Sequence, residues 1–240
     1  MQLWNALGLD PAKQRLVTLV GGGGKTTCLY ALAREMRDLG KTVIITTTTH
    51  IVPHPGLFLT EELEAEPLKA LLAEYGIITV GRLNSKEKMV GADNLPACKA
   101  AADLVLAEGD GARVHPLKAP ADHEPVVPPE ADAVIAVAGM DALGQPIGLI
   151  CHRPERVCAL LGQDLAHLIT PADVAHILAS PQGGRKSVPE DRAFRCLLNK
   201  ADSPEKQHQA EEIAAILADR GIPAAITSFT EEERGGLCWF

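Results

Sequence analysis

Short runs of apolar, mostly β-branched residues alternate along the chain with stretches whose apolar residues recur at helical spacing. The runs predict strands at residues 16–20, 42–46, 77–80, 104–107, 133–138, 195–198 and 224–227. Strands this apolar are typical of a sheet that is covered on both faces. Because strands and helices alternate, the pattern predicts an α/β fold: a mostly parallel sheet with helices on both faces.

The clearest helix is predicted over residues 25–39. Its apolar residues Leu29, Leu32 and Met36 share one face, and Gly40 follows at the C-terminus, where glycine commonly ends a helix. This helix comes directly after the first predicted strand, so the two form the start of a strand–helix–strand unit.

Two segments interrupt the alternation. Residues 109–129 contain five prolines and are too long for a plain connection, which predicts a functional loop. Residues 145–193 carry short predicted helices at 154–161 and 171–178. We interpret 145–193 as a helical insertion before a late strand, inside a single domain that covers residues 1–240.

The composition is that of a globular protein: 46% of the residues are hydrophobic, 22% are charged, and the formal net charge is −8. The acidic balance argues against nucleic acid or an anionic membrane as a partner. The first residues lack the regions of a signal peptide, and no apolar stretch is long enough to span a bilayer. Six scattered cysteines favour reduced thiols. We therefore expect a cytoplasmic protein.

A glycine-rich sequence joins the first predicted strand to the first predicted helix. Its predicted phosphate-binding residues are Gly21, Gly22, Gly23, Gly24, Lys25, Thr26 and Thr27. Glycines let main-chain N–H groups approach phosphate oxygens, and the start of a helix favours negative charge. Lys25 can reach the β- and γ-phosphates, and the Thr26 hydroxyl can bind Mg²⁺. Leu19 stands where the usual motif has its first glycine, so this loop is the shorter Gly-x-x-Gly-Lys-Thr form.

Two acidic residues follow the strand predicted at 104–107. Glu108 and Asp110 stand among glycines at its carboxyl end, the edge at which open parallel sheets bind ligands. Because Mg²⁺ prefers hard oxygen ligands, we predict a magnesium site made by Thr26 with Glu108 and Asp110, without ranking the two carboxylates. The alternative is a solvated turn rich in Asp and Gly.

A second motif follows the strand predicted at 195–198. It consists of Asn199, Lys200 and Asp202 in the spacing Asn-Lys-x-Asp, with Ser203 placed to cap a following helix. The Asp202 carboxylate can accept from both N1–H and the exocyclic amine of guanine, whereas adenine presents an acceptor at N1. The motif therefore predicts a preference for GTP over ATP; a turn with a capping aspartate is the alternative.

Five strings in order along nearly the whole chain resemble the YqeC family. They are VGGGGKTT from residue 20, TTTTHIVPHP from 46, AEGDGARVHPLKAPADHEPVVP from 107, CHRPE from 151 and LLNKAD from 197. Members are described as accessory proteins for selenium-dependent molybdenum hydroxylases, or as selenium cofactor biosynthesis proteins. The resemblance implies a P-loop NTPase-like fold and a nucleotide-binding role in maturing a molybdenum hydroxylase, with that enzyme or its cofactor as partner. The resemblance also implies a second site specific to the family, without assigning it a chemistry. The candidate residues are Gly111, Lys118, His123, Glu124 and Arg153.

Three functions are compatible with these motifs. The first is a nucleoside triphosphatase, more readily a GTPase than an ATPase, in which Lys25, Thr26 and Asp110 act on the phosphates and Mg²⁺. The sequence offers no evident glutamine to orient water and no evident arginine finger, which predicts slow turnover until a partner binds. The second is an ATP-dependent ligase or kinase, because the short loop resembles that of the Mur ligases. The third is a non-catalytic, nucleotide-gated adaptor.

Overall fold

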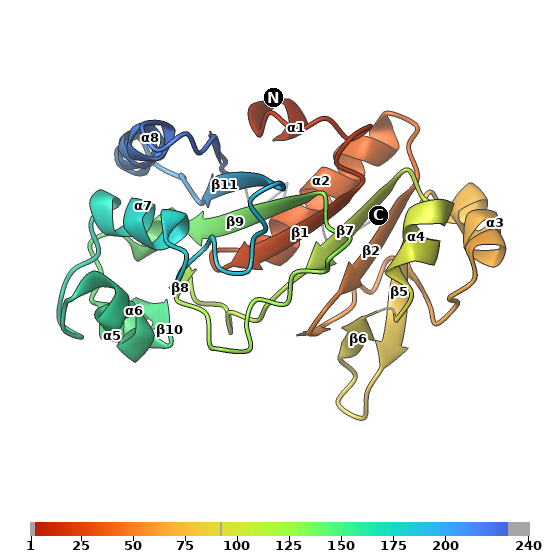
Figure 1. Cartoon of the computed structure of the whole chain (residues 1–240), viewed down its shortest axis with the longest axis horizontal. Helices are drawn as coiled ribbons and strands as arrows, with labels where there is room; N and C mark the ends of the chain where they lie inside the picture. The colour runs from red at the N-terminus through yellow and green to blue at the C-terminus, as the bar shows by residue number, and fades with distance from the viewer. Residues whose placement is uncertain (1–2, 92, 230–240) are drawn as a thin grey trace.

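The computed structural model describes residues 3–91 and 93–229, and its centre is a ten-stranded, mostly parallel sheet (Figure 1). The strand order is β12 (Ala224–Ile226), β11 (Ala193–Asn199), β9 (Ala133–Gly139), β1 (Leu16–Gly21), β7 (Leu104–Glu108), β2 (Val43–Thr47), β5 (Ile77–Leu83), β6 (Met89–Gly91) and β3 (His50–Ile51), with β4 (Phe58–Thr60) beside β5. Among the described strands of this sheet, only the pairings of β6 with β5 and β3 are antiparallel. The predicted α/β fold class is confirmed.

Helices cover both faces of the sheet. The helices are α1 (Leu3–Ala6), α2 (Lys25–Asp38), α3 (Ala65–Tyr75), α4 (Leu95–Ala101), α5 (Ile147–Ile150), α6 (Pro154–Leu161), α7 (Pro171–Ala179) and α8 (Pro204–Ala218), with a short 3₁₀ turn at Met140–Ala142. Alternate residues of the strands face opposite sides, so Val17 and Leu19 of β1 pack with α1 and α2, whereas Leu16 packs in the cluster that contains α3 and α4.

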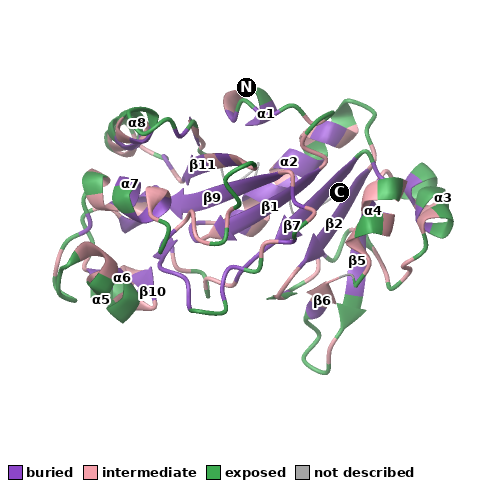
Figure 2. Cartoon of the chain, viewed as in Figure 1, coloured by how far each residue is buried: buried purple, intermediate pink, exposed green. Residues whose placement is uncertain are grey.

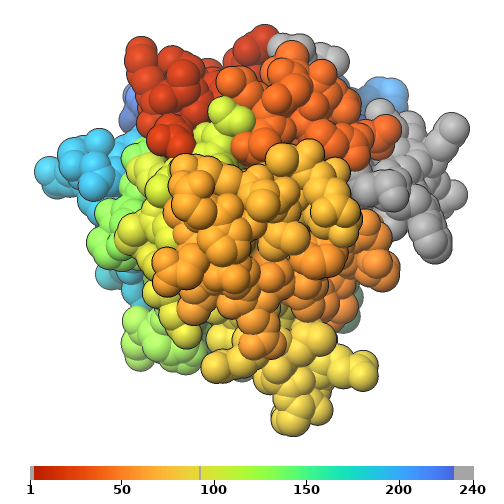
Figure 3. Space-filling model, turned by 90° about the vertical axis from the view of Figure 1, so that its right-hand side faces the viewer, coloured from red at the N-terminus to blue at the C-terminus, as the bar shows by residue number. Residues whose placement is uncertain are grey.

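The face of the sheet that carries α3 and α4 is covered at its other end by α7 and α8. Val134 and Ala136 of β9 pack in one cluster with Val174 of α7 and Ile213 of α8. Figure 2 shows the central strands buried and the outward sides of these helices exposed. At the opposite end of the molecule, α3 forms the surface and the hairpin between β5 and β6 projects beyond it (Figure 3).

Each predicted strand coincides with an observed one to within a few residues, as do the predicted helices at 25–39, 154–161 and 171–178. The predicted cap is also present, because the Ser203 hydroxyl accepts a hydrogen bond from the N–H of Lys206. The hydrophobic pattern did not indicate the helices α1, α3 and α4 or the short strands β3, β4 and β6. It also did not indicate a separate two-stranded sheet. Its strands β8 (Leu117–Lys118) and β10 (Cys151–His152) are too short to have a periodicity of their own.

The remaining sequence expectations concern segments rather than elements. The segment 145–193 contains α5, β10, α6 and α7, so it carries a strand besides the expected helices. None of the described helices has the length and apolar character to cross a membrane. The described cysteines form no disulfide, and Cys238 lies outside the described residues.

The buried face of α2 gives a direct test of this packing. Leu32 is completely buried between α2 and the sheet, so Leu32→Ala should lower the free energy of unfolding by about 2–5 kcal/mol through lost contacts and a cavity. Leu39, at the end of the same helix, is 56% exposed, and Leu39→Ala should change it by less than about 0.5 kcal/mol. Urea unfolding followed by circular dichroism measures both, and equal losses would contradict the arrangement.

Candidate functional site

The predicted phosphate-binding loop connects the carboxyl end of β1 to the first turn of α2, as the sequence motif requires. Gly21 and Gly23 have φ angles of 97° and 76°, in the region that favours glycine. A Cβ atom on Gly23 would lie 2.1 Å from the main-chain nitrogen of Gly139, and one on Gly21 would lie 2.4 Å from the carbonyl oxygen of Val137. The loop therefore packs backbone to backbone against the end of β9, and side chains cannot occupy these positions.

Three amides of this loop are bonded inside the protein. The N–H of Gly22 donates to the carbonyl of Val137 at 2.9 Å, and the N–H of Gly23 donates to the carbonyl of His115 at 3.1 Å. The N–H of Gly21 faces both carboxylate oxygens of Asp110, each at 3.1 Å. The sequence motif predicts Gly21, Gly22 and Gly23 as phosphate-binding residues, whereas in the structure their N–H groups donate inside the protein.

The donors that remain for a phosphate belong to the start of α2. They are the N–H groups of Gly24, Lys25, Thr26 and Thr27, which precede the first intrahelical hydrogen bond, donated by Cys28 to Gly24. The positive end of the helix dipole lies at the same place. The geometry therefore presents a cradle of first-turn amides, supported by the glycine loop behind it.

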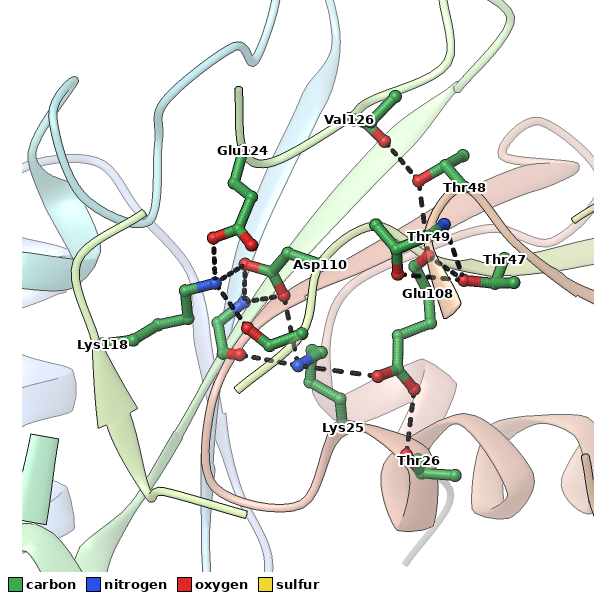
Figure 4. A network of polar contacts seen from close by, with 12 residues as sticks. Lys25, Thr26, Thr47, Thr48, Thr49, Glu108, Asp110, Lys118, Glu124 and Val126 are labelled. Atoms are coloured by element: carbon green, nitrogen blue, oxygen red, sulfur yellow. Dashed lines mark hydrogen bonds and ion pairs between the residues drawn. The ribbon is translucent and has the colours of Figure 1, made fainter. Parts of the chain in front are cut away.

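Lys25 lies at the centre of a buried network of charged groups (Figure 4). Its ammonium nitrogen donates to the carbonyl of Gly21 at 2.7 Å and lies 3.1 Å from Asp110 Oδ1 and 3.7 Å from Glu108 Oε1. The other oxygen of Glu108 accepts from the hydroxyl of Thr26 at 2.9 Å. The structure thus brings together the predicted lysine and threonine of α2 with the predicted carboxylates, Glu108 at the end of β7 and Asp110 two residues beyond it.

A second buried lysine extends this network away from the cradle. Lys118 of β8 donates to Asp110 at 3.0 Å, to Glu124 at 2.8 Å and to the carbonyl of Gly111 at 2.7 Å. The guanidinium of Arg153 binds the other oxygen of Glu124 at 2.9 Å. Of the residues singled out by resemblance, Gly111, Lys118, Glu124 and Arg153 therefore cluster together, whereas His123 has no contact in this network.

The protonation of the carboxylates follows from their surroundings. Burial raises the pKa of Glu108, although Lys25 and the Thr26 hydroxyl oppose that effect. Burial also acts on Glu124, but there the hydrogen bonds from Lys118 and Arg153 outweigh it and lower the pKa to about 2. Glu124 is therefore ionised at neutral pH. Glu108, whose pKa is raised, takes up a proton at a higher pH than Glu124 does.

The motif of Asn199, Lys200 and Asp202 lies at the carboxyl ends of β11 and β12 and contacts the glycine loop. The buried Asn199 donates through Nδ2 to the carbonyl of Gly23 at 2.8 Å and accepts from the Thr227 hydroxyl at 3.1 Å. Asp202 is exposed, and the hydroxyl of Ser228 donates to its Oδ1 at 2.6 Å. Asn199 thus joins the two predicted motifs, which are far apart in the sequence.

Lys200 has a partner that the sequence analysis missed. Its backbone has a φ angle of 64°, and its ammonium nitrogen lies 2.6 Å from a carboxylate oxygen of Asp141. Asp141 lies two residues after the end of β9, so its position after an apolar strand was the available signal. Thr227 and Ser228, which hold Asn199 and Asp202, follow the last strand in the same way.

A sequence model of the YqeC protein family matches residues 17–155, so the chain belongs to this family. The matched range contains the glycine loop, the acidic residues after β7, and the network through Arg153; the motif at 199–202 lies beyond it. The chain is also 28% identical over 235 residues to a protein of Escherichia coli strain K12 described as "Uncharacterized protein YqeC", a match that covers 92% of this chain and 90% of that one.

The lowered pKa of Glu124 predicts a specific dependence of stability on pH. Because folding lowers this pKa from 4.5 to about 2, the ionised Glu124 stabilises the protein above pH 4.5, and this contribution disappears as the pH falls through 2. By linkage it amounts to about 3 kcal/mol at most. Glu124→Gln should therefore lower the free energy of unfolding most at pH 6 and least near pH 2, as measured by denaturant unfolding at a series of pH values.

Glu66 of α3 provides the matched control, because its side chain is 82% exposed and its ion pair is with the half-exposed Lys69. Glu66→Gln should change the free energy of unfolding by less than about 0.5 kcal/mol at every pH. A loss in Glu124→Gln that is the same at pH 2 and pH 6 would contradict the assignment.

Proposed function

We propose that this protein binds a nucleoside triphosphate, preferentially GTP, together with Mg²⁺, and hydrolyses it slowly while serving in the maturation of a selenium-dependent molybdenum hydroxylase. The maturation role rests on family membership and on the resemblance of the five strings. The assignment of a nucleotide as the ligand is supported above all by one observation. Asn199 of the proposed base-recognition motif donates a hydrogen bond to the carbonyl of Gly23 in the proposed phosphate-binding loop. The two motifs are therefore arranged so that a single nucleotide can bridge them.

The phosphates are assigned to the first turn of α2. The N–H groups from Gly24 to Thr27 and the helix dipole favour an anion there. The Lys25 ammonium lies between Asp110 and Glu108, so a phosphate that binds here competes with these carboxylates for the same cation. Lys25 then stabilises the negative charge that develops on the transferred phosphoryl group.

Mg²⁺ is assigned to Thr26 and Glu108. Two neighbouring ligands of an octahedral Mg²⁺ ion, each about 2.0–2.1 Å from the metal, lie about 2.9 Å apart. The Thr26 hydroxyl and Glu108 Oε2 are separated by 2.9 Å. Asp110 is a poorer ligand, because its oxygens already accept from Gly21, Lys25 and Lys118. We therefore rank Glu108 above Asp110, a choice that the sequence left open, and assign Asp110 to holding the loop and Lys25. When bound, the ion neutralises phosphate charge.

The base is assigned to Asp202. Ser228 fixes Oδ1, and the exposed carboxylate can accept from N1–H and the exocyclic amine of guanine. A contact of this kind is worth about 1–3 kcal/mol of discrimination between bases.

A change of specificity tests the base assignment without depending on loss of function. Asparagine keeps one acceptor oxygen but replaces the other with an NH₂ donor, which matches xanthine, whose position 2 carries a carbonyl acceptor. Asp202→Asn should therefore weaken GTP binding about tenfold or more and strengthen xanthosine triphosphate binding by a similar factor, as measured by calorimetry with Mg²⁺.

Two controls accompany this measurement. Asp219→Asn, at the end of α8, changes the same charge away from the site and should leave both affinities unchanged. Lys25→Gln should abolish binding of both nucleotides, and its fold is checked by circular dichroism. An Asp202→Asn variant with an unchanged preference for GTP would refute guanine recognition, and wild type that retains no triphosphate would refute the proposed function.

Hydrolysis separates an enzyme from an adaptor. The cradle supplies Lys25 and the first-turn amides, but the sequence offers no evident residue to orient the attacking water, so we expect slow phosphate release from the isolated protein that a molybdenum hydroxylase accelerates. Phosphate release from GTP, with and without that enzyme, is the measurement. Rapid release by the isolated protein would contradict slow turnover, and no release under either condition would favour the nucleotide-gated adaptor.

A further inference from the structure

A cavity of about 390 Å³ lies where the loop before β8 meets the segment around β10. Arg113 and His115 line it from the loop, and His152 and Arg153 line it from the strand and the residue that follows. No carboxylate is among its lining residues, although the chain as a whole carries a net charge of −8. The cavity therefore combines two guanidinium groups and two imidazoles in an otherwise acidic protein.

Both arginines keep hydrogen-bonding capacity for a ligand. Arg113 forms no ion pair among the residues that the structure describes. Arg153 uses one terminal nitrogen to bind Glu124, but its Nε–H is buried and has no hydrogen-bond partner within the described ranges. A buried donor of this kind costs free energy unless something accepts from it. A planar guanidinium with unused donors is suited to the oxygens of a phosphate.

The two histidines offer ring nitrogens as hydrogen-bonding groups in the cavity. The rings of His115 and His152 stack with their centroids 5.9 Å apart, and His115 Nδ1 contacts the carbonyl of Ile150 at 3.1 Å. Burial, aided by Lys118 and Arg153 nearby, lowers the pKa of His152 to about 4. His152 is therefore neutral at pH 7, and the two arginines supply permanent positive charge. Cys151 also lines the cavity, but burial raises its pKa to about 12, so it offers no thiolate.

The backbone beside the cavity is held in an uncommon conformation. Arg113 and Val114 have φ angles of 48° and 70°, in a turn closed by a hydrogen bond from the N–H of His115 to the carbonyl of Ala112. Such conformations cost about 1–3 kcal/mol each for residues other than glycine. The Val114 side chain is 95% exposed, so its packing does not offset that cost. The turn places Arg113 at the cavity.

We propose that this cavity is a second anion site, which binds a phosphate-class dianion between Arg113 and Arg153, next to the glycine loop of residues 21–24. Its volume falls in the range of small-molecule pockets and exceeds what an inorganic ion fills, which favours a phosphate carried by a small organic molecule. His115 belongs to both sites, because its ring lines the cavity while its carbonyl accepts from Gly23 of the phosphate-binding loop. This inference does not depend on nucleotide binding.

The test uses the ring signals of His115 and His152 as local reporters. Protein labelled with ¹⁵N is titrated at pH 7, without nucleotide, with inorganic phosphate in one series and with glycerol 3-phosphate in another, and His115→Gln and His152→Gln assign the signals. We expect both probes to shift the His152 signals in a saturable manner. Tighter binding of the ester identifies a phosphorylated organic ligand, and equal binding identifies the free oxyanion.

Variants connect the shifts to the cavity. Arg113→Gln should weaken binding of both probes about tenfold or more, because a charge-assisted hydrogen bond is lost. Arg82→Gln removes an exposed arginine on β5 and should leave the titration unchanged. Arg113 is itself exposed, so Arg113→Gln should fold normally, which a thermal unfolding scan verifies. Unmoved His152 signals at millimolar phosphate and ester, or an Arg113→Gln variant that titrates like wild type, would overturn the proposal.

Discussion

The position of Asp110 between two buried lysines is the interaction on which the site depends. The Asp110 side chain is 2% exposed, and its oxygens face Lys25, Lys118 and the N–H of Gly21. A carboxylate and two ammonium groups removed from water are tolerable only when they are paired and hydrogen-bonded. Asp110 therefore fixes the loop, the cradle lysine and the first residues of the long proline-rich segment at once.

From Asp110 the charges alternate in both directions. On one side Lys25 is followed by Glu108 and the Thr26 hydroxyl, and on the other Lys118 is followed by Glu124 and Arg153. Each ion lies beside partners of opposite sign, which offsets the cost of burying it. The pairing of β8 with β10 places Lys118 opposite His152, directly before Arg153. The cradle and the cavity at Arg153 therefore belong to one connected polar structure.

The glycine loop has a structural task besides any ligand. Its first amides donate to Asp110, Val137 and His115, and the loop touches the backbone of β9 closely enough to exclude side chains. Asn199, at the end of β11 on the other side of β9, donates a further hydrogen bond to the carbonyl of Gly23. A loop held in this way presents the first turn of α2 in a preorganised geometry, which suits the recognition of an anion without the cost of ordering a mobile segment.

The sequence by itself determined the α/β class, the strands β1, β2, β5, β7, β9, β11 and β12, the position of the glycine loop between β1 and α2, and the cap at Ser203. These features depend on local periodicity and on the conformational preferences of single residues. The tertiary structure alone decided that Asp110 forms an ion pair with Lys118. It also decided that Glu108, rather than Asp110, accepts a hydrogen bond from the Thr26 hydroxyl, and that Asn199 donates one to the carbonyl of Gly23. It also formed the two-residue strands β8 and β10. The contacts of Glu108 with Thr26 and of Asn199 with Gly23 join residues that are distant in the chain. Such contacts depend on the register of parallel strands and on long-range packing, which leave no local pattern in the sequence.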